Sequence, residues 1–394
     1  MRPRFLPQLV NGRMGDPGLL VRLLDERRAL LFDLGDLAAL APRALLRVSD
    51  AFVSHAHVDH FIGFDRLLRL LVGRAKRLRL WGPPRFADRV AARLAGYEWN
   101  LVHRFRDELV IEVAEFHGEG DGDGRLRRSR FRLATGFARE GLGEAPAPGG
   151  LLLADPGLSV HAAPFDHDGL VSLGFRLAEP AHLNIWKTRL AGMGLAPGRW
   201  LAGLKRAIRE GAPDGTLLPV AWASGRAGPA ALPLGRLRPL VSETPGQKIA
   251  YLTDLSPTPE NEARAIAFVR GVDVLFIEAP FRTADAVLAR ERGHLTTALA
   301  GRIARAAGAA RVEPFHFSPR YEREEEAVVA EVLAAFEGGA GAAVQGTAPG
   351  KAEGQTTARA GAEAGGAGSQ RRAGRKAAAG RRSGAGARCR VLRP

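Results

Sequence analysis

The most informative stretch of this chain is residues 54–60, SHAHVDH, which follow the apolar run 50–53. In an extended segment, side chains two residues apart point the same way, so His55 and His57 are placed to bind one metal ion. If the chain then turns, Asp59 and the histidine after it lie toward a second ion. Imidazole and carboxylate groups suit zinc and similar divalent ions, and a pair of such ions activates water against phosphoryl or acyl centres. A surface histidine cluster or a tag is the alternative, but a tag would lie at a terminus.

A dinuclear centre needs more ligands than this stretch supplies, and we expect them where strands end beside turns. Three such positions carry suitable side chains: His167 before a predicted strand, Asp254 at the end of the predicted strand 249–253, and His316 after another strand. The two oxygens of Asp254 can bridge two cations. His294 lies directly ahead of a predicted helix and is a candidate for catalysis.

Each of these residues also has an ordinary structural explanation. His167 alone could be a core or surface histidine. A strand-end aspartate such as Asp254 is often the N-cap of a following helix, and His294 could belong to the N-cap region before Thr296. Glu278 could be a solvated or salt-bridged carboxylate rather than a catalytic one. Four other histidines have no motif context and are interpreted as structural: His103, His117, His161 and His182.

The elements that must position these residues alternate between strands and helices. We expect strands at 30–35, 50–53, 78–81, 109–116, 151–153, 160–163, 171–177, 248–253, 272–277 and 310–314. We expect helices at 61–71, 85–94, 200–210, 259–270, 296–307 and 322–336. Residues 118–124 and 141–150 are typical of loops, with a basic segment between them. Local hairpins mixed with alternating helices predict an α/β (α+β) sandwich with helices on the outside.

The 394-residue chain carries a net charge of +15, which is concentrated near the C-terminus. From Gly338 onward there are 11 basic and 2 acidic residues among many Gly and Ala. Because this segment has almost no large apolar side chains, we expect residues 338–394 to form a disordered tail behind a domain of residues 1–337. Two interpretations of the tail stay open: an arm that binds RNA or DNA phosphates, or a composition-biased extension.

Cysteine content and hydropathy restrict the class of protein. The single cysteine, Cys389, excludes a disulfide framework and thiolate zinc sites. No apolar run approaches the roughly 18 residues that a membrane span requires, and the first residues lack an apolar secretory signal. We therefore expect a cytoplasmic protein that does not bind membranes.

Together these motifs resemble the metallo-β-lactamase superfamily and, within it, the ribonuclease Z (tRNA 3′-endonuclease) branch. The SHAHVDH stretch is similar to the superfamily signature. Four further segments resemble motifs of the branch: FDH at 165–167 with LGFR at 173–176, YLTD at 251–254, HLTTA at 294–298, and HFSPRY at 316–321. The last of these is nearly identical to the final motif of the branch. The resemblance extends over roughly residues 32–336.

The resemblance implies a four-layered αββα sandwich with two zinc ions at one edge. It implies that His55, His57 and His167 bind the first ion, that Asp59, His60 and His316 bind the second, and that Asp254 bridges them. A hydroxide on the metal would attack a phosphodiester, Asp59 would orient or deprotonate that water, and His294, oriented by Glu278, would act as general acid. Manganese or iron could replace zinc, because affinity order alone does not choose the metal. The implied partner is a tRNA precursor, and a homodimer is usual in the branch.

The chain also departs from the branch. The N-terminal glycine motif and the Pro- and Arg-bearing substrate loop are not recognisable in residues 1–30, and the His-Glu-Ala-Thr loop has Ile277 and Pro280 at its ends. In the other direction, an insertion at about 181–242 begins where the branch carries a substrate arm, and its basic helix would suit tRNA phosphates. Three functions stay open: tRNA 3′ processing, hydrolysis of small esters or cyclic phosphodiesters, and nucleic-acid binding with a structural metal site.

Overall fold

Two large β-sheets form the centre of the computed structural model, which describes residues 3–24, 26–118 and 124–338. The larger sheet has eight strands in chain order: β1 (Phe5–Leu9), β2 (Leu19–Leu23), β3 (Ala29–Phe32), β4 (Val48–Phe52), β5 (Lys76–Gly82), β6 (Leu109–His117), β7 (Gly124–Arg132) and β8 (Arg139–Ala147). The smaller sheet has six strands in the order β18 (Val312–Phe315), β17 (Val274–Glu278), β16 (Lys248–Leu252), β11 (Leu170–Ala178), β10 (Leu158–His167) and β9 (Leu151–Asp155).

Parallel pairing occurs in the middle of the larger sheet, from β3 to β6, and at one side of the smaller sheet, from β16 to β18. Parallel neighbours need crossover connections, and these supply most of the helices. The first half of the chain contributes α1 (Pro42–Leu45), α2 (Val58–Phe61), α3 (Phe64–Leu71) and α4 (Phe86–Ala95). The second half contributes α8 (Pro259–Phe268), α9 (Ala286–Glu291), α10 (Thr297–Ala306) and α11 (Glu325–Glu337).

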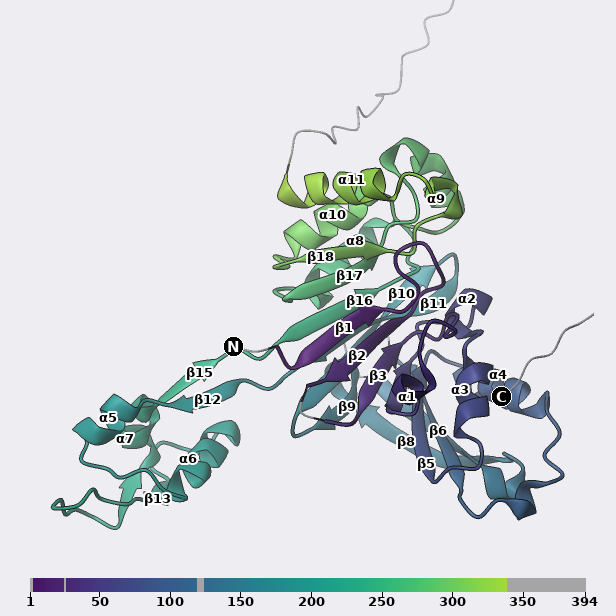
Figure 1. Cartoon of the computed structure of the whole chain (residues 1–394). Helices are drawn as coiled ribbons and strands as arrows, with labels where there is room; N and C mark the ends of the chain where they lie inside the picture. The colour runs from purple at the N-terminus through teal and green to yellow at the C-terminus, as the bar shows by residue number, and fades with distance from the viewer. Residues whose placement is uncertain (1–2, 25, 119–123, 339–394) are drawn as a thin grey trace, which may run out of the picture. The chain divides into compact units, whose positions relative to one another are not determined.

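Three apolar clusters show how these elements are layered. In one cluster, Phe64 of α3 packs with Leu80 of the larger sheet. A second cluster lies between the sheets, where the rings of Phe52 and Phe175 have centroids 5.7 Å apart. A third joins Ile303 of α10 to the smaller sheet. Figure 1 shows α8, α10 and α11 on one side of the sheets and α3 and α4 on the other. The predicted αββα sandwich is therefore confirmed.

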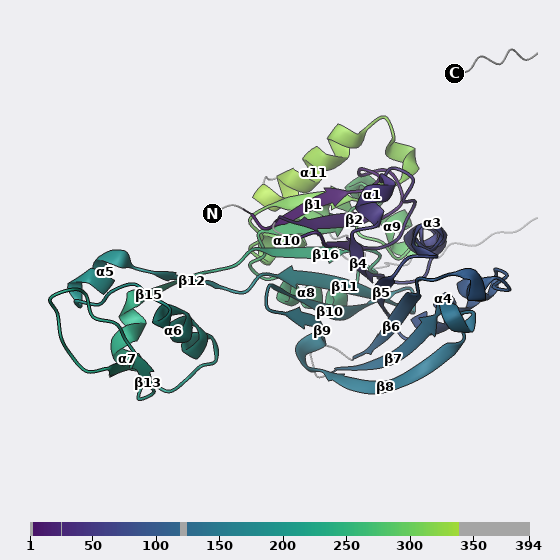
Figure 2. The ribbon, with the colours of Figure 1, turned by 60° about the horizontal axis from the view of Figure 1, so that its bottom comes forward.

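Most predicted elements are present, but two predictions were wrong in detail. The helix expected at 61–71 is divided into α2 and α3 at Gly63, where a Cβ atom would lie 2.1 Å from the carbonyl oxygen of Gly35. Residues 141–150 were expected to form a loop, yet β8 extends through Ala147. Figure 2 shows β8 next to β7 at the edge of the larger sheet. Because this edge strand is mostly exposed, it lacks the apolar alternation by which strands are recognised.

The predicted insertion has its own small core. It contains β12 (His182–Ile185), α5 (Lys187–Gly192), α6 (Trp200–Arg209), β13 (Leu217–Pro219), β14 (Ala231–Pro233), α7 (Leu234–Leu237) and β15 (Val241–Thr244). β12 and β15 pair antiparallel, so the chain enters and leaves the insertion through one two-stranded ribbon. Its apolar cluster includes the fully buried Leu204 and Leu237. The basic helix predicted at 200–210 is confirmed as α6.

No helix among residues 3–24, 26–118 and 124–338 combines the length and apolar character needed to cross a membrane. The predicted tail at 338–394 lies outside the described residues, apart from its first residue.

Candidate metal centre

The first motif, residues 54–60, begins just after β4. His55 is buried there, whereas His57 is exposed and has an extended backbone, with φ −65° and ψ 159°. α2 begins at the next residue, so the chain turns between His57 and Asp59 as predicted. The imidazole rings of His55 and His57 have centroids 4.3 Å apart. The short spacing of this motif therefore places two imidazoles side by side.

The other predicted ligands lie at strand ends of the smaller sheet. His167 is the last residue of β10, Asp254 follows β16, and His316 follows β18. Asp254 has φ 51° and His316 has φ 59°. This left-handed conformation costs residues other than glycine about 1–3 kcal/mol and persists only where the surroundings impose it. Here it accompanies a close approach, because His316 Nδ1 lies 3.0 Å from Asp254 Oδ1.

These residues converge into groups of potential ligand atoms. The donors of the first group lie within 4.8 Å of one another and come from His55, His57, His167 and Asp254. A second group meets the same limit and contains Asp59, His60 and His316. Asp254 is close to both groups, since its Oδ2 atom lies 3.5 Å from His55 Nε2 and 3.4 Å from His60 Nε2. The structure thus brings together all seven residues predicted as ligands.

The chemistry of these donors fits a divalent cation. The Nε2 atoms of His55 and His60 are buried and have no hydrogen-bond partner. Together with His167 Nε2, they surround Asp254 Oδ2 at 3.4–3.5 Å, which is longer than a good N–H···O hydrogen bond. Buried nitrogen atoms without partners are costly, and imidazole with carboxylate is the donor set of zinc and similar ions.

Known proteins are similar in sequence to this chain over most of its length. The ribonuclease Z of Deinococcus radiodurans is 34% identical over 270 residues, which cover 68% of this chain and 75% of that protein. The chain belongs to the ribonuclease Z family. The ribonuclease BN of Cronobacter sakazakii is also similar to this chain, being 30% identical over 296 residues that cover 74% of this chain and 78% of that protein.

A family model and a solved structure are also similar to parts of this chain. The family model of the beta-lactamase superfamily domain matches residues 216–317. The human short-form tRNase Z has a TM-score of 0.45 and 18% identity, over 81% of this chain and 93% of that one. Membership of the family makes the chain a metal-dependent hydrolase. The alternative of a nucleic-acid-binding protein with a purely structural metal site does not fit this membership.

Hydrogen bonds orient two of the imidazoles that point toward Asp254 in this member of the ribonuclease Z family. His60 Nδ1 lies 2.8 Å from the carboxylate of Asp33, and His167 Nδ1 lies 2.9 Å from the carbonyl oxygen of Gly293. When a histidine donates one ring N–H to such an acceptor, its other nitrogen is fixed toward the metal. Both Nε2 atoms are therefore held in place by the protein itself.

Asp33 is a functional residue that our sequence reasoning missed. It is fully buried at the end of β3, and its oxygens accept hydrogen bonds from the backbone N–H of Ser54 at 2.7 Å and the hydroxyl of Tyr251 at 2.9 Å. Asp33 therefore links β3, the first motif and β16 behind His60. The available signal was an aspartate directly after a buried apolar run.

His294 and Glu278 form a further pair beside these two ligand groups, and with Asp254 and His316 they make a third set of potential ligand atoms within 4.8 Å of one another. Glu278 is fully buried at the end of β17, and its Oε2 lies 2.9 Å from His294 Nδ1. Its other oxygen accepts the backbone N–H groups of Leu255 and Leu295. The negative charge of Glu278 outweighs the burial of His294 and raises the pKa of that imidazole. Glu278 is thus a buried partner of His294 and not a solvated carboxylate.

The helix-capping alternatives have different outcomes. The N-cap of α8 is Thr258, whose side chain accepts the N–H of Asn261, so Asp254 is not an N-cap. The N-cap of α10 is Thr296, and His294 lies two residues before it as that alternative expected, with its ring bonded to Glu278. None of the four histidines interpreted as structural occurs in a ligand group within residues 3–24, 26–118 and 124–338.

The two ligand groups differ in charge before any metal binds. Burial lowers the pKa of His55 to about 2, helped by the positive charge of His60 nearby. His60 is also buried, but Asp254 and Asp33 outweigh that burial and raise its pKa to about 10. At neutral pH His55 is therefore neutral and ready to coordinate, whereas a cation that binds His60 must displace a proton.

A pocket of about 260 Å³ opens in front of Asp59, His294 and His316. One of its walls is the segment 14–17, which belongs to the loop between β1 and β2. Pro280 and Phe281 also line this pocket. The N-terminal loop does not carry the motif expected of the ribonuclease Z family, so sequence reasoning missed it, although its Gly and Asp residues are typical of a structured turn.

Proposed function

We propose that this chain is a metal-dependent phosphodiesterase that cuts tRNA precursors on the 3′ side, with two divalent cations, normally zinc, in its site. One observation carries the proposal: the two ligand groups lie side by side around Asp254. The names of its relatives, ribonuclease Z and tRNase Z, are those of RNA-cleaving enzymes. The basic helix α6 adds positive charge suited to phosphates.

The site residues have two kinds of role in this proposal: some would bind the metal ions, and others would orient water or transfer a proton. His55, His57 and His167 would hold one ion, and Asp59, His60 and His316 would hold the other. Asp254, which lies close to both groups, would contribute its carboxylate to the centre. When bound, the pair of cations supplies Lewis acidity to the phosphoryl oxygens and lowers the pKa of water.

Asp59 orients the attacking water. It lies 3.4 Å from His316 Nε2, and although burial alone would raise the pKa of Asp59, the neighbouring histidines lower it. A carboxylate with a low pKa is a weak base, but it accepts a hydrogen bond at every working pH. Its contribution is therefore the direction of attack rather than removal of the proton.

His294 holds the proton that the leaving oxygen needs. The raised pKa of His294 favours the protonated imidazole, and Glu278 balances its charge. Burial alone would raise the pKa of Glu278, but the positive charge of His294 lowers it to about 2, so Glu278 stays ionised. His294 lines the pocket together with Asp59, so it can reach a phosphodiester held there.

The direct test is to incubate the purified protein with a labelled tRNA precursor carrying a 3′ extension, with and without a chelator. We expect one endonucleolytic cut at the 3′ side of the tRNA, which disappears with chelator and returns when zinc is added. Absence of the cut in protein that contains its metal would contradict the proposal.

A second candidate function is supported by the lining of the pocket. Among the described residues that line it, none is Lys or Arg, and Asp16 adds a carboxylate at the rim. This arrangement favours a hydrolase of small esters or cyclic phosphodiesters. Turnover of bis(p-nitrophenyl) phosphate without cleavage of the tRNA precursor would select this candidate.

A further inference from the structure

The N-terminal loop, which forms one wall of the pocket, contacts the segment around His316 through Arg13. We infer that Arg13 is a positioning residue, which fixes the loop of residues 11–17 against the segment that carries His316. The kinetic part of this inference rests on the proposed function, whereas the structural part does not.

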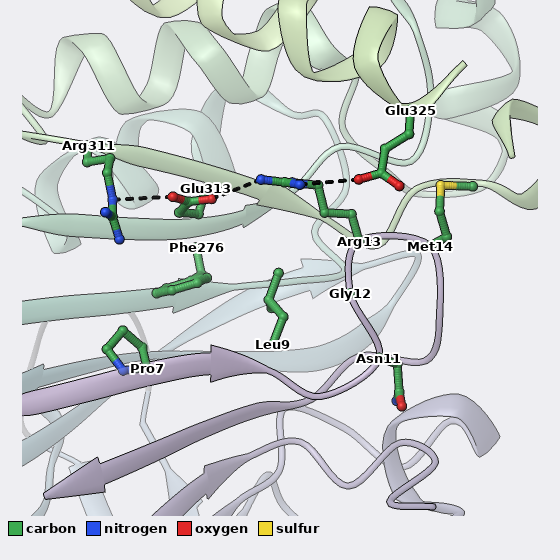
Figure 3. Close-up of a pocket in the computed structure, with 10 residues that line it drawn as sticks. All are labelled: Pro7, Leu9, Asn11, Gly12, Arg13, Met14, Phe276, Arg311, Glu313 and Glu325. Atoms are coloured by element: carbon green, nitrogen blue, oxygen red, sulfur yellow. Dashed lines mark hydrogen bonds and ion pairs between the residues drawn. The ribbon is translucent and has the colours of Figure 1, made fainter. Parts of the chain in front are cut away.

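Arg13 contacts two carboxylates from two different elements. Its Nη2 atom lies 3.2 Å from Glu313 Oε2 in β18, and its Nη1 atom lies 3.2 Å from Glu325 Oε1 at the start of α11. Figure 3 shows the guanidinium group between these two side chains, on the wall of a cavity of about 430 Å³. The planar fork of arginine allows it to bridge two acceptors in this way.

The backbone of the same residue makes a third contact. The carbonyl oxygen of Arg13 accepts the N–H of Phe317 at 2.9 Å. Glu313 comes three residues before His316, and Phe317 comes directly after His316. Arg13 therefore holds the chain on both sides of a residue whose backbone is in the left-handed conformation.

The next residues of the loop face the reaction site. The partly buried Met14 packs against the apolar cluster that contains Ile303 of α10, and the segment 14–17 lines the pocket together with His294 and His316. Asn11 secures the other side of the loop, because its Nδ2 donates to the carbonyl oxygens of Asp16 and Asp36. The loop is thus pinned at both sides, and Arg13 supplies the attachment to the His316 segment.

Because its guanidinium is occupied by two carboxylates, Arg13 is not placed to bind substrate phosphate. Ion pairs between partly exposed side chains contribute little to global stability. Loss of Arg13 should therefore act locally, by releasing the loop and misplacing the pocket wall, and a small misplacement in a site reduces turnover strongly.

The test compares Arg13→Gln with Arg311→Gln. Arg311 is a matched control, because its Nε lies 3.3 Å from the other oxygen of Glu313 while the residue lies outside the loop. Hydrogen exchange of residues 11–17 is measured on metal-free and metal-loaded protein. We expect exchange about tenfold faster in Arg13→Gln and unchanged in Arg311→Gln, with metal content equal in both. The kcat for bis(p-nitrophenyl) phosphate should fall about tenfold in Arg13→Gln alone.

Arg13→Lys provides a second variant, since a lysine keeps the charge but cannot bridge both carboxylates. We expect it to fall between the wild type and Arg13→Gln in loop exchange. Equal exchange of residues 11–17 in the wild type, Arg13→Lys and Arg13→Gln would overturn the inference. If the wild type turns over no phosphodiester, the proposed function fails, but the exchange experiment still decides the role of Arg13.

Discussion

The floor of the site and its rim are built by different means. We call His55, His60, His167 and Asp254 the floor, and the segment 14–17 with His294 the rim. The floor residues are all buried: His55, His167 and Asp254 lie at or just after strand ends, and His60 lies in α2. Asp33 and Gly293 orient two of them. The rim consists of loop residues that line an open pocket. The difference indicates that the floor determines metal binding, whereas the rim determines how substrate and proton are placed.

The largest effect should follow from a change in the floor. Asp254→Ala removes the carboxylate close to both ligand groups, so we expect loss of bound metal and a fall in activity of at least roughly a thousandfold, or about 4 kcal/mol of barrier. Metal content by elemental analysis and turnover are measured together. Asp273→Ala is the control, because Asp273 is an exposed aspartate on the neighbouring strand connection. Full metal content in Asp254→Ala would contradict the claim that the floor determines metal binding.

A change in the rim should spare the metal. His294→Ala removes the proton donor, so we expect turnover to fall about a hundredfold while the metal content stays at the wild-type level. His103→Ala serves as the control, since His103 belongs to no ligand group. Loss of metal in His294→Ala would instead place that residue in the floor.

Glu278→Gln should change the pH dependence more than the maximal rate. An acid catalyst works only while it is protonated, so activity falls as pH rises through the pKa of His294. Removing the negative charge of Glu278 lowers that pKa, so the fall should begin at a lower pH, with a loss of roughly tenfold at the basic end of the profile. The measurement is a pH–rate profile of both proteins. An unchanged basic limb would show that His294 is not the titrating acid.

The smallest effect should come from the layer beneath the floor. Tyr251→Phe removes the hydroxyl that donates to Asp33 at 2.9 Å but leaves the bond between Asp33 and His60 intact. We expect metal affinity to fall by less than about tenfold, measured by competition with a chelating dye. Tyr97→Phe, at an exposed position, is the control and should show no change.

Sequence reasoning reached the predicted metal ligands more readily than the pocket wall formed by residues 14–17. His55, His57 and Asp59 are close along the chain, and their spacing alone places them together. Asp254 and His316 could be predicted because each follows an apolar run that reads as a strand. The role of Asp33 could not, because its contact with Tyr251 spans 218 residues and depends on how the two sheets pack.

The N-terminal loop illustrates the same limit at the rim. Arg13 meets its carboxylates 300 and 312 residues further along the chain. No local pattern in residues 11–17 indicates that Arg13 contacts Glu313 and Glu325, so the loop was not expected to line the pocket. The edge strand β8 was missed for a related reason, since it lies largely in solvent and shows no apolar period.

The central claim is that two divalent cations, held around Asp254, support cleavage of a phosphodiester. Metal stoichiometry of the active protein by native mass spectrometry, measured on the same sample as turnover, tests it most directly. We predict two metal ions per chain in wild-type protein and a loss of activity in parallel with their removal. Full turnover by protein that holds no stoichiometric metal would contradict the account.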